Sequence, residues 1–262
     1  MESDHLRVDV QEGIATVTLN RPEKRNAITI GMWGSFAGIM ERLAADPEVR
    51  AIVYRGAGEK GFSAGGDISE FTELMKSPEH AKVEFPIIQS ALESLERCPK
   101  AVLFMIHGYA YGGAMILATA GHIRIAAEGA KFGIPSARVG ISVSYHDTVR
   151  TVRLIGPAKA KELFFTAGVI DAEEAKQCGL VNRVVPLADL EKTTYDMART
   201  IARMAPLSIA GANETVNTCA ADPGLTTVKE GDALTVKTFM SEDFQEGVNA
   251  FLEKREPKFV GR

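Results

Sequence analysis

The sequence predicts an α/β fold in which parallel strands alternate with helices. Two segments show the same order, a short strand, a glycine-rich turn and a helix: the turns lie at residues 62–67 and 111–114. The strand before the second turn, AVLFMIHG, is apolar along its length, which is typical of a parallel strand buried on both faces. Strand–turn–helix units that recur along a chain indicate a parallel sheet covered by helices.

In the N-terminal part, residues 13–20 (GIATVTLN) have the composition of a strand, which Pro22 ends. Five apolar residues then recur at helical intervals and predict one face of a helix: Met32, Phe36, Ile39, Met40 and Leu43. This helix should stop at Asp46, which precedes a proline. We expect the single tryptophan, Trp33, to pack within it.

Residues 49–56 form the next predicted strand, and the chain then enters the first glycine turn. A longer helix follows a break at Ser77–Pro78 and ends at Cys98–Pro99. Residues 122–127 form another strand. Asp171 is placed to cap a compact helix over 171–179.

From about residue 188 onward the strand signals stop, and the chain indicates helices broken near MAPLS and ADPG. We therefore expect a core over residues 1–195 and a C-terminal helical segment over 196–262. This segment should pack on the core or on another subunit.

Composition limits the partners of this chain. With 30 Lys and Arg against 34 Asp and Glu, the net charge is −4 and no basic cluster stands out, which argues against nucleic acid. No stretch approaches the ~20 apolar residues of a membrane span, and the polar N-terminus has no secretory signal pattern, so we expect a cytoplasmic protein. The three cysteines (Cys98, Cys178 and Cys219) are widely spaced, so we expect reduced, mostly buried thiols without a zinc site.

The glycine turns indicate a site made from backbone groups. A phosphate loop of the GxxxxGK[ST] type is absent, and GYAYGG does not match GxGxxG, which argues against a nucleotide cofactor. Helix starts leave several amide N–H groups without internal partners and carry partial positive charge. Two such turns brought together can direct two amides at one oxygen, which is an oxyanion hole.

Six stretches of the chain carry a family resemblance. They are LNRPEKRNAI (19–28), FSAGGDI (62–68), GYAYGGA (108–114), FGIPSARVGI (132–141), AKELFFTAGVIDAEEAKQCGLVNRVV (160–185) and SEDFQEGVNAFLEKREPKF (241–259). Together they resemble the enoyl-CoA hydratase/isomerase, or crotonase, family over nearly the whole chain. The resemblance implies a spiral of β-β-α units, a C-terminal helical trimerisation segment and trimers that pair into hexamers. It also implies an acyl-CoA thioester substrate, with coenzyme A entering as part of the substrate and no separate cofactor or metal.

The resemblance places the two oxyanion donors on the amides of Ala64 and Gly113. It brings Lys24 and Arg25 toward the phosphates of coenzyme A and Lys254 toward the coenzyme A of a neighbouring chain. For these three cations the alternative is solvated surface charge. The remaining residues that we assign to substrate binding are Ala27, Gly65, Asp67, Ile68, Tyr111, Gly112, Ser136 and Tyr145.

The sequence departs from the family at its acids. The two glutamates that hydratases of this family use are replaced by Ile116 and Ser136. An isoleucine carries no proton, and an unassisted serine hydroxyl is a poor general base near neutral pH. Hydration and simple isomerisation are therefore both in doubt.

Residues 140–148 (GISVSYHDT) replace a loop that is small and apolar in the family. His146 and Asp147 are candidates for a relocated acid/base pair. The alternative is that Asp147 caps the next helix while His146 faces solvent. Tyr111 either donates to the substrate or packs, and we expect His107 to be a hydrogen-bonded structural residue and Asp67 to cap a helix.

Three functions remain open at this point. The first is an acyl-CoA enzyme that stabilises a thioester enolate with a relocated acid or base. The second is a decarboxylase or thioester hydrolase on the same fold; decarboxylation needs the enolate held but no base to create it. The third is an acyl-CoA-binding protein without turnover.

Overall fold

The computed structural model describes residues 5–70, 78–222 and 233–262. Its larger sheet has six strands in the order β1-β2-β3-β4-β6-β9, and a smaller sheet has the order β5-β7-β8. The strands of the larger sheet are β1 (Leu6–Gln11), β2 (Ile14–Leu19), β3 (Ala51–Gly56), β4 (Ala101–Ile106), β6 (Ile123–Ala127) and β9 (Arg183–Val185). Those of the smaller sheet are β5 (Tyr109–Tyr111), β7 (Lys131–Gly133) and β8 (Ile170–Asp171). From β2 to β9 every neighbouring pair of the larger sheet is parallel, which confirms the predicted class.

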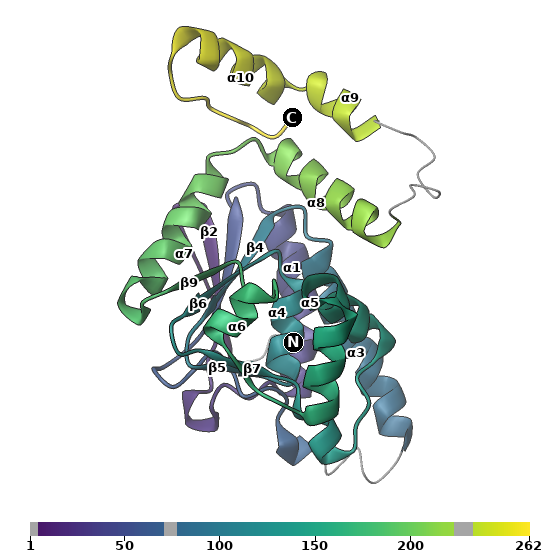
Figure 1. Cartoon of the computed structure of the whole chain (residues 1–262). Helices are drawn as coiled ribbons and strands as arrows, with labels where there is room; N and C mark the ends of the chain where they lie inside the picture. The colour runs from purple at the N-terminus through teal and green to yellow at the C-terminus, as the bar shows by residue number, and fades with distance from the viewer. Residues whose placement is uncertain (1–4, 71–77, 223–232) are drawn as a thin grey trace.

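Helices cover both faces of the larger sheet (Figure 1). They are α1 (Ile30–Ala45), α3 (Pro78–Glu96), α4 (Gly113–Ala120), α5 (Tyr145–Thr166), α6 (Ala172–Gln177), α7 (Leu187–Ala202), α8 (Pro206–Ala221), α9 (Ala233–Phe239) and α10 (Glu242–Glu253). Short 3₁₀ turns, η1 (Pro22–Lys24) and η2 (Pro135–Val139), lie in the loops. The predicted cap is confirmed at α6, where the Asp171 side chain accepts from the amide of Glu174. The helix over 30–45 is confirmed as well, whereas the break at Ser77–Pro78 lies at the edge of the described residues.

Strand β4 shows why its sequence is apolar throughout. Successive side chains of a strand point to opposite faces of the sheet. Val102, Phe104 and Ile106 belong to the cluster that packs under α1, α3 and α4. The alternate residues of β4 belong to a second cluster, which α7 covers with Leu190 and Ala198. Both faces of this strand are therefore buried.

The C-terminal helices extend away from the sheets (Figure 1). The boundary predicted at residue 195 falls inside α7, which packs on the larger sheet, and α8 to α10 follow it. These last helices expose large apolar side chains: Val216, Val236, Phe239, Met240, Phe244, Val248, Phe251 and Leu252. None of the described helices has a stretch both long and apolar enough to cross a membrane.

The cysteines differ from the expectation of mostly buried thiols. Cys98, two residues after the end of α3, is buried, but Cys178 is half-buried and Cys219 is exposed on α8. The three do not pair, and the described residues contain no cluster of ligands for a metal.

A line of buried aromatic rings supports the region between the two glycine turns. Trp33 of α1 meets Phe36 edge-on at 5.6 Å, and Phe36 lies 5.9 Å from Tyr54. Tyr54 stacks on Phe104 at 5.1 Å, and Phe104 meets Phe62 at 5.7 Å. Phe62 directly precedes the first turn. The expectation that Trp33 packs as a core residue is confirmed, because it is 4% exposed.

Phe104→Ala should destabilise the protein by about 3–5 kcal/mol, because it removes the ring that touches both Tyr54 and Phe62. Phe165→Ala, at a side chain that is 77% exposed, should change the free energy of unfolding by less than about 0.5 kcal/mol. Urea unfolding of both variants measures the difference. Equal effects would show that the aromatic line does not hold this part of the core.

Candidate active site

The loop that follows β2 is fastened to the first glycine turn by a buried asparagine. Asn26 is 1% exposed, and its side chain accepts from the amide of Arg21 at 3.0 Å. The same side chain donates to the carbonyls of Ala57 and Gly61 at 2.8 and 3.1 Å. The Asn26 carbonyl in turn accepts from the hydroxyl of Ser63 at 2.7 Å. The loop over residues 21–28 and the segment over 57–67 therefore form one unit.

The first turn is joined to β5, the strand that leads into the second turn. The amide of Ser63 donates to the Tyr109 carbonyl, and the amide of Tyr111 donates to the Ser63 carbonyl, both at 3.1 Å. Ser63 and Ala110 thus form a parallel bridge. The two turns lie side by side, as the sequence predicts.

Gly65 makes the closest approach between the turns. Its φ is +98°, and a Cβ placed on it would lie 2.4 Å from the Tyr111 carbonyl oxygen and 3.2 Å from the amide nitrogen of Gly113. Such a φ is unfavourable for any residue with a side chain. The conformation and the close packing both require glycine here.

The predicted role of the Ala64 amide as an oxyanion donor is wrong. Its N–H donates to the carbonyl of Arg25 at 3.0 Å, so it is already satisfied within the fold. The next amide, that of Gly65, donates to the Ser63 hydroxyl at 3.1 Å. The loop over residues 21–28 therefore binds the Ala64 amide, which is the donor that the family resemblance indicated.

Gly66 provides the amide that faces the second turn. Ile28 bonds to the residues on either side of it: the Ile28 amide donates to the Gly65 carbonyl at 2.8 Å, and the Ile28 carbonyl accepts from Asp67 at 3.0 Å. The amide of Gly66 consequently points away from Ile28. A Cβ on Gly113 would lie 3.5 Å from the Gly66 nitrogen, so the two residues are in contact.

Gly113 begins α4 and carries one of the unpaired amides of its first turn. Gly112, which precedes it, has φ +51° and donates its own N–H to the Gly133 carbonyl at 2.8 Å. Neither Gly66 nor Gly113 has a recorded acceptor for its amide among the residues that the structure describes. Two neighbouring amides of the described residues are thus left without an acceptor inside the fold.

Arg21 is a residue that our sequence analysis missed. It is 9% exposed, and one guanidinium nitrogen donates to the Ala27 carbonyl and to the Asp67 carboxylate, both at 2.8 Å. Asp67 also accepts from the amide of Ser69 at 3.1 Å, which confirms the predicted cap. Hydrogen bonds from Ser69 and Arg21 lower the pKa of Asp67 to about 2. This ion pair holds the residue that directly follows Gly66.

The predicted coenzyme A contacts divide into two groups. Lys24 and Arg25 are exposed in the loop that is joined to the first turn, and Ile68 is 70% exposed beside it. Lys254 is exposed at the end of α10, and Figure 1 places that helix at the opposite end of the molecule from β5 and β7. Within one chain Lys254 therefore does not join the other residues.

Ile116 and Ser136 are the residues that the family resemblance aligns with the two glutamates of the hydratases. Ile116 lies in the first turn of α4, half-buried and packed against the core. Ser136 is half-buried in η2. Tyr111 is half-buried too, and its ring stacks on Tyr109 at 5.5 Å, which favours packing for this residue. His107 is buried and its Nε2 lies 3.0 Å from the Gly58 carbonyl, so its predicted structural role is confirmed.

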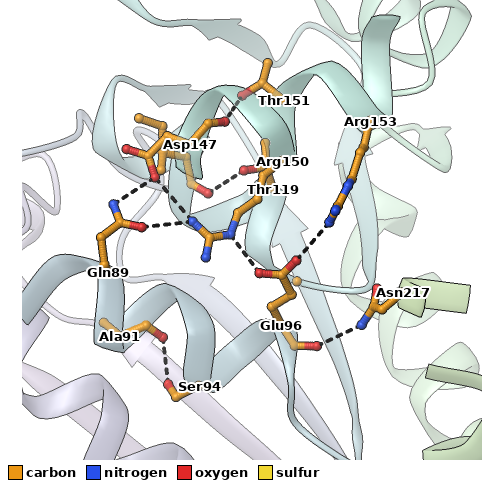
Figure 2. Close-up of polar contacts among 12 residues, drawn as sticks. Gln89, Ala91, Ser94, Glu96, Thr119, Asp147, Arg150, Thr151, Arg153 and Asn217 are labelled. Atoms are coloured by element: carbon orange, nitrogen blue, oxygen red, sulfur yellow. Dashed lines mark hydrogen bonds and ion pairs between the residues drawn. The ribbon is translucent and has the colours of Figure 1, made fainter. Parts of the chain in front are cut away.

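The start of α5 separates the proposed acid/base pair. The helix is capped by Ser144, whose hydroxyl accepts from the amide of Asp147 at 3.0 Å, so the expectation that Asp147 supplies the cap is wrong. Asp147 is buried and accepts from Gln89 of α3 at 3.1 Å and from Arg150 at 3.4 Å (Figure 2). His146 is exposed. The structure records no hydrogen bond between His146 and Asp147, and the pair therefore loses its geometric basis.

Arg150 extends this polar cluster between α3 and α5. Its Nε donates to the Glu96 carboxylate at 3.0 Å, and Arg153 contacts the same carboxylate at 3.5 Å (Figure 2). Tyr145 is 92% exposed at the helix start. A mixed-charge depression of about 330 Å³ lies here, lined by both helices, including Tyr145, His146 and Arg150. The charges of this cluster pair with one another, which indicates a structural connection of the two helices.

Gly65→Ala should destabilise the protein by several kcal/mol and abolish ligand binding, since the new Cβ would lie 2.4 Å from the Tyr111 carbonyl. Gly129→Ala is the matched control: its φ is +76°, but nothing lies within 4 Å of the added Cβ, so it should cost about 1–2 kcal/mol. Denaturant unfolding compares the two. If both variants lost the same free energy, the close approach of the turns would be in error.

The Asp67 carboxylate should stabilise the fold at neutral pH and lose that effect in acid. Its folded pKa, about 2, lies below the ordinary 3.8, so the stabilisation is present above pH 4 and declines as pH falls toward 2. Asp67→Asn should therefore cost about 2 kcal/mol at pH 7 and progressively less below pH 4. The exposed Glu173→Gln should stay within about 0.5 kcal/mol throughout. A pH-independent cost for Asp67→Asn would contradict the ion pair.

Comparison with known proteins places this geometry in a family. The family model described as Enoyl-CoA hydratase/isomerase matches residues 9–262. The short-chain-enoyl-CoA hydratase of Clostridium acetobutylicum is 35% identical over 259 residues, with 97% of each chain covered. The crotonyl-CoA hydratase of Syntrophomonas wolfei is 34% identical over 266 residues, and the match covers 100% of both chains. A crystal structure described as an enoyl-CoA hydratase/carnithine racemase from Magnetospirillum magneticum matches with a TM-score of 0.94 at 34% identity, covering 100% of this chain and 97% of that one. The chain belongs to the enoyl-CoA hydratase/isomerase family and has the crotonase fold.

Proposed function

We propose that this chain binds an acyl-CoA thioester with its carbonyl oxygen between the amides of Gly66 and Gly113. The contact between these residues and the absence of a recorded partner for either amide support the proposal. Negative charge that develops on the oxygen is then stabilised by two donors and by the start of α4. Loss of one such donor typically costs about 3 kcal/mol of transition-state stabilisation.

The reaction that we propose takes account of the two glutamates that this site lacks. Ile116 and Ser136 stand where hydratases of the family have their glutamates, so the site holds an enolate without the usual groups that add water to a double bond. A reaction that creates the enolate without a base suits it best. In decarboxylation of a malonyl-type thioester the bond to the carboxylate breaks, its electron pair moves onto the thioester carbonyl and carbon dioxide leaves. A proton then adds to the α-carbon.

Thioester hydrolysis in the same oxyanion hole is the alternative reaction, and acyl-CoA binding without turnover is the non-catalytic one. Coenzyme A enters in each case as part of the substrate. Lys24 and Arg25 place positive charge on the loop that is fastened to the first turn. The exposed apolar side chains of α8 to α10 support self-association as a trimer or a pair of trimers, which would give Lys254 access to a neighbouring site.

The wild-type protein should bind crotonyl-CoA but not hydrate it rapidly. Binding is followed by the fluorescence of Trp33, the single tryptophan, whose ring would lie 3.4 Å from a Cβ on Gly113. Hydration is followed by loss of the conjugated thioester absorbance. Incubation with methylmalonyl-CoA should yield propionyl-CoA, detected by mass spectrometry.

The outcomes separate the alternatives. Rapid hydration of crotonyl-CoA would contradict the role given to the absent glutamates. Free coenzyme A without a decarboxylated acyl product would favour hydrolysis, and binding without turnover of an acyl-CoA panel would favour the binding protein. A Trp33 signal unchanged by every acyl-CoA would argue against the site itself.

A further inference from the structure

Arg124 in β6 is a buried cation that has no carboxylate partner in the part of the chain that the structure describes. It is 3% exposed, and its guanidinium donates only to backbone carbonyls among the described residues. These acceptors are Leu180 at 2.7 Å, Ala118 at 3.1 Å, Gly121 at 2.7 Å and His122 at 3.4 Å. Buried charges are usually paired, because desolvation makes an isolated one costly. Burial lowers the pKa of Arg124 to about 10, so it remains charged at neutral pH.

The imidazole of His122, whose pKa is lowered by burial and by the charge of Arg124, does not neutralise this charge. His122 Nδ1 accepts from the amide of Val102 at 3.1 Å, so that nitrogen carries no proton. Nε2 then holds the ring's single proton and faces the Glu96 carbonyl at 3.4 Å. Burial, with a contribution from Arg124, lowers the pKa of His122 and keeps the ring neutral. The Glu96 carboxylate itself is engaged by Arg150 and Arg153.

The guanidinium lies at the end of the helix that supplies the Gly113 amide. Ala118 belongs to the last turn of α4 and Gly121 is its C-cap. The helix has eight residues, so its two ends are about 12 Å apart. A unit charge at about 12 Å in surroundings of effective dielectric ~20 changes the stability of an anion by about tenfold. The neighbouring carbonyls fix the guanidinium without cancelling its full charge.

We propose that Arg124 is a positioning residue that strengthens anion binding at the Gly113 amide, by orienting α4 and by placing an uncompensated positive charge at its far end. This inference rests on the proposed function, because it deepens the same oxyanion site. It explains why a full charge is buried where a neutral residue would pack at lower cost.

The test uses acetoacetyl-CoA, a β-keto thioester whose enolate is detected by its ultraviolet absorbance. A pH titration of the bound ligand gives the apparent pKa of its enolisation. Arg124→Met should raise this value by about one pH unit, equivalent to a tenfold weaker hold on the enolate, whereas Arg124→Lys should leave it close to wild type. Lys176→Met, at an exposed lysine of α6, is the control and should cause no change because water screens its charge.

His122→Asp provides a second arm if Arg124→Met does not fold. Because the charge of Arg124 acts on the His122 side chain, an aspartate at this position would place a compensating negative charge near the guanidinium. The enolisation pKa should then rise as it does in Arg124→Met. Equal values in wild type, Arg124→Met and His122→Asp would overturn the role of Arg124. If even the wild-type protein fails to lower the value below that of free acetoacetyl-CoA, the proposed oxyanion site fails instead.

Discussion

The approach of the Gly65 backbone to the Tyr111 carbonyl governs the geometry of the whole site. The two segments come from separate strand–turn–helix units, and they touch only because no side chain stands between them. Ser63 forms two hydrogen bonds with β5: its amide donates to the Tyr109 carbonyl, and its carbonyl accepts from the Tyr111 amide. As a result Gly66 and Gly113 lie in contact, and neither of their amides donates to an acceptor among the described residues.

This arrangement places the chemistry of the site on the backbone. Side chains near the turns serve mainly to hold it: Arg21 bonds to Asp67, and Asn26 occupies the gap between two loops. In the proposed site, stabilisation of an oxygen anion by two amides does not depend on acidic side chains nearby. A site of this kind can serve different reactions within one family, because the amides stay the same while the side chains around the thioester differ.

The sequence predicted β2, β3, β4 and β6 with the turns and helices between them, because each glycine turn is a local signal with apolar periodicity on both sides. It did not predict the edge strand β1 or the short strands β5, β7 and β8 of the smaller sheet. It did not predict which amide of the first turn is free. Ala64 donates to Arg25, a residue 39 positions earlier, and no local pattern reveals a bond of that range. The family motif pointed to Ala64, whereas the donor that we propose is Gly66, two residues further along the same turn.

The second prediction that the structure contradicts is the acid/base pair of His146 and Asp147. His146 and Asp147 are neighbours in the sequence, but the helix that begins at Tyr145 directs Asp147 toward Gln89 and leaves His146 exposed. The helix cap falls on Ser144 instead. Arg124 was missed because it interrupts an apolar strand without any motif, and its contacts are backbone carbonyls at the end of α4 and at Leu180. The periodicity of a strand says nothing about such partners.

A crystal structure of the protein with a bound acyl-CoA tests the central claim most directly. The account predicts that the thioester oxygen lies within about 3.2 Å of both the Gly66 and the Gly113 nitrogens, while Ala64 still donates to Arg25. An acyl-CoA whose thioester oxygen contacts neither amide, or one that reaches the Ala64 amide in place of the Gly66 amide, would contradict it.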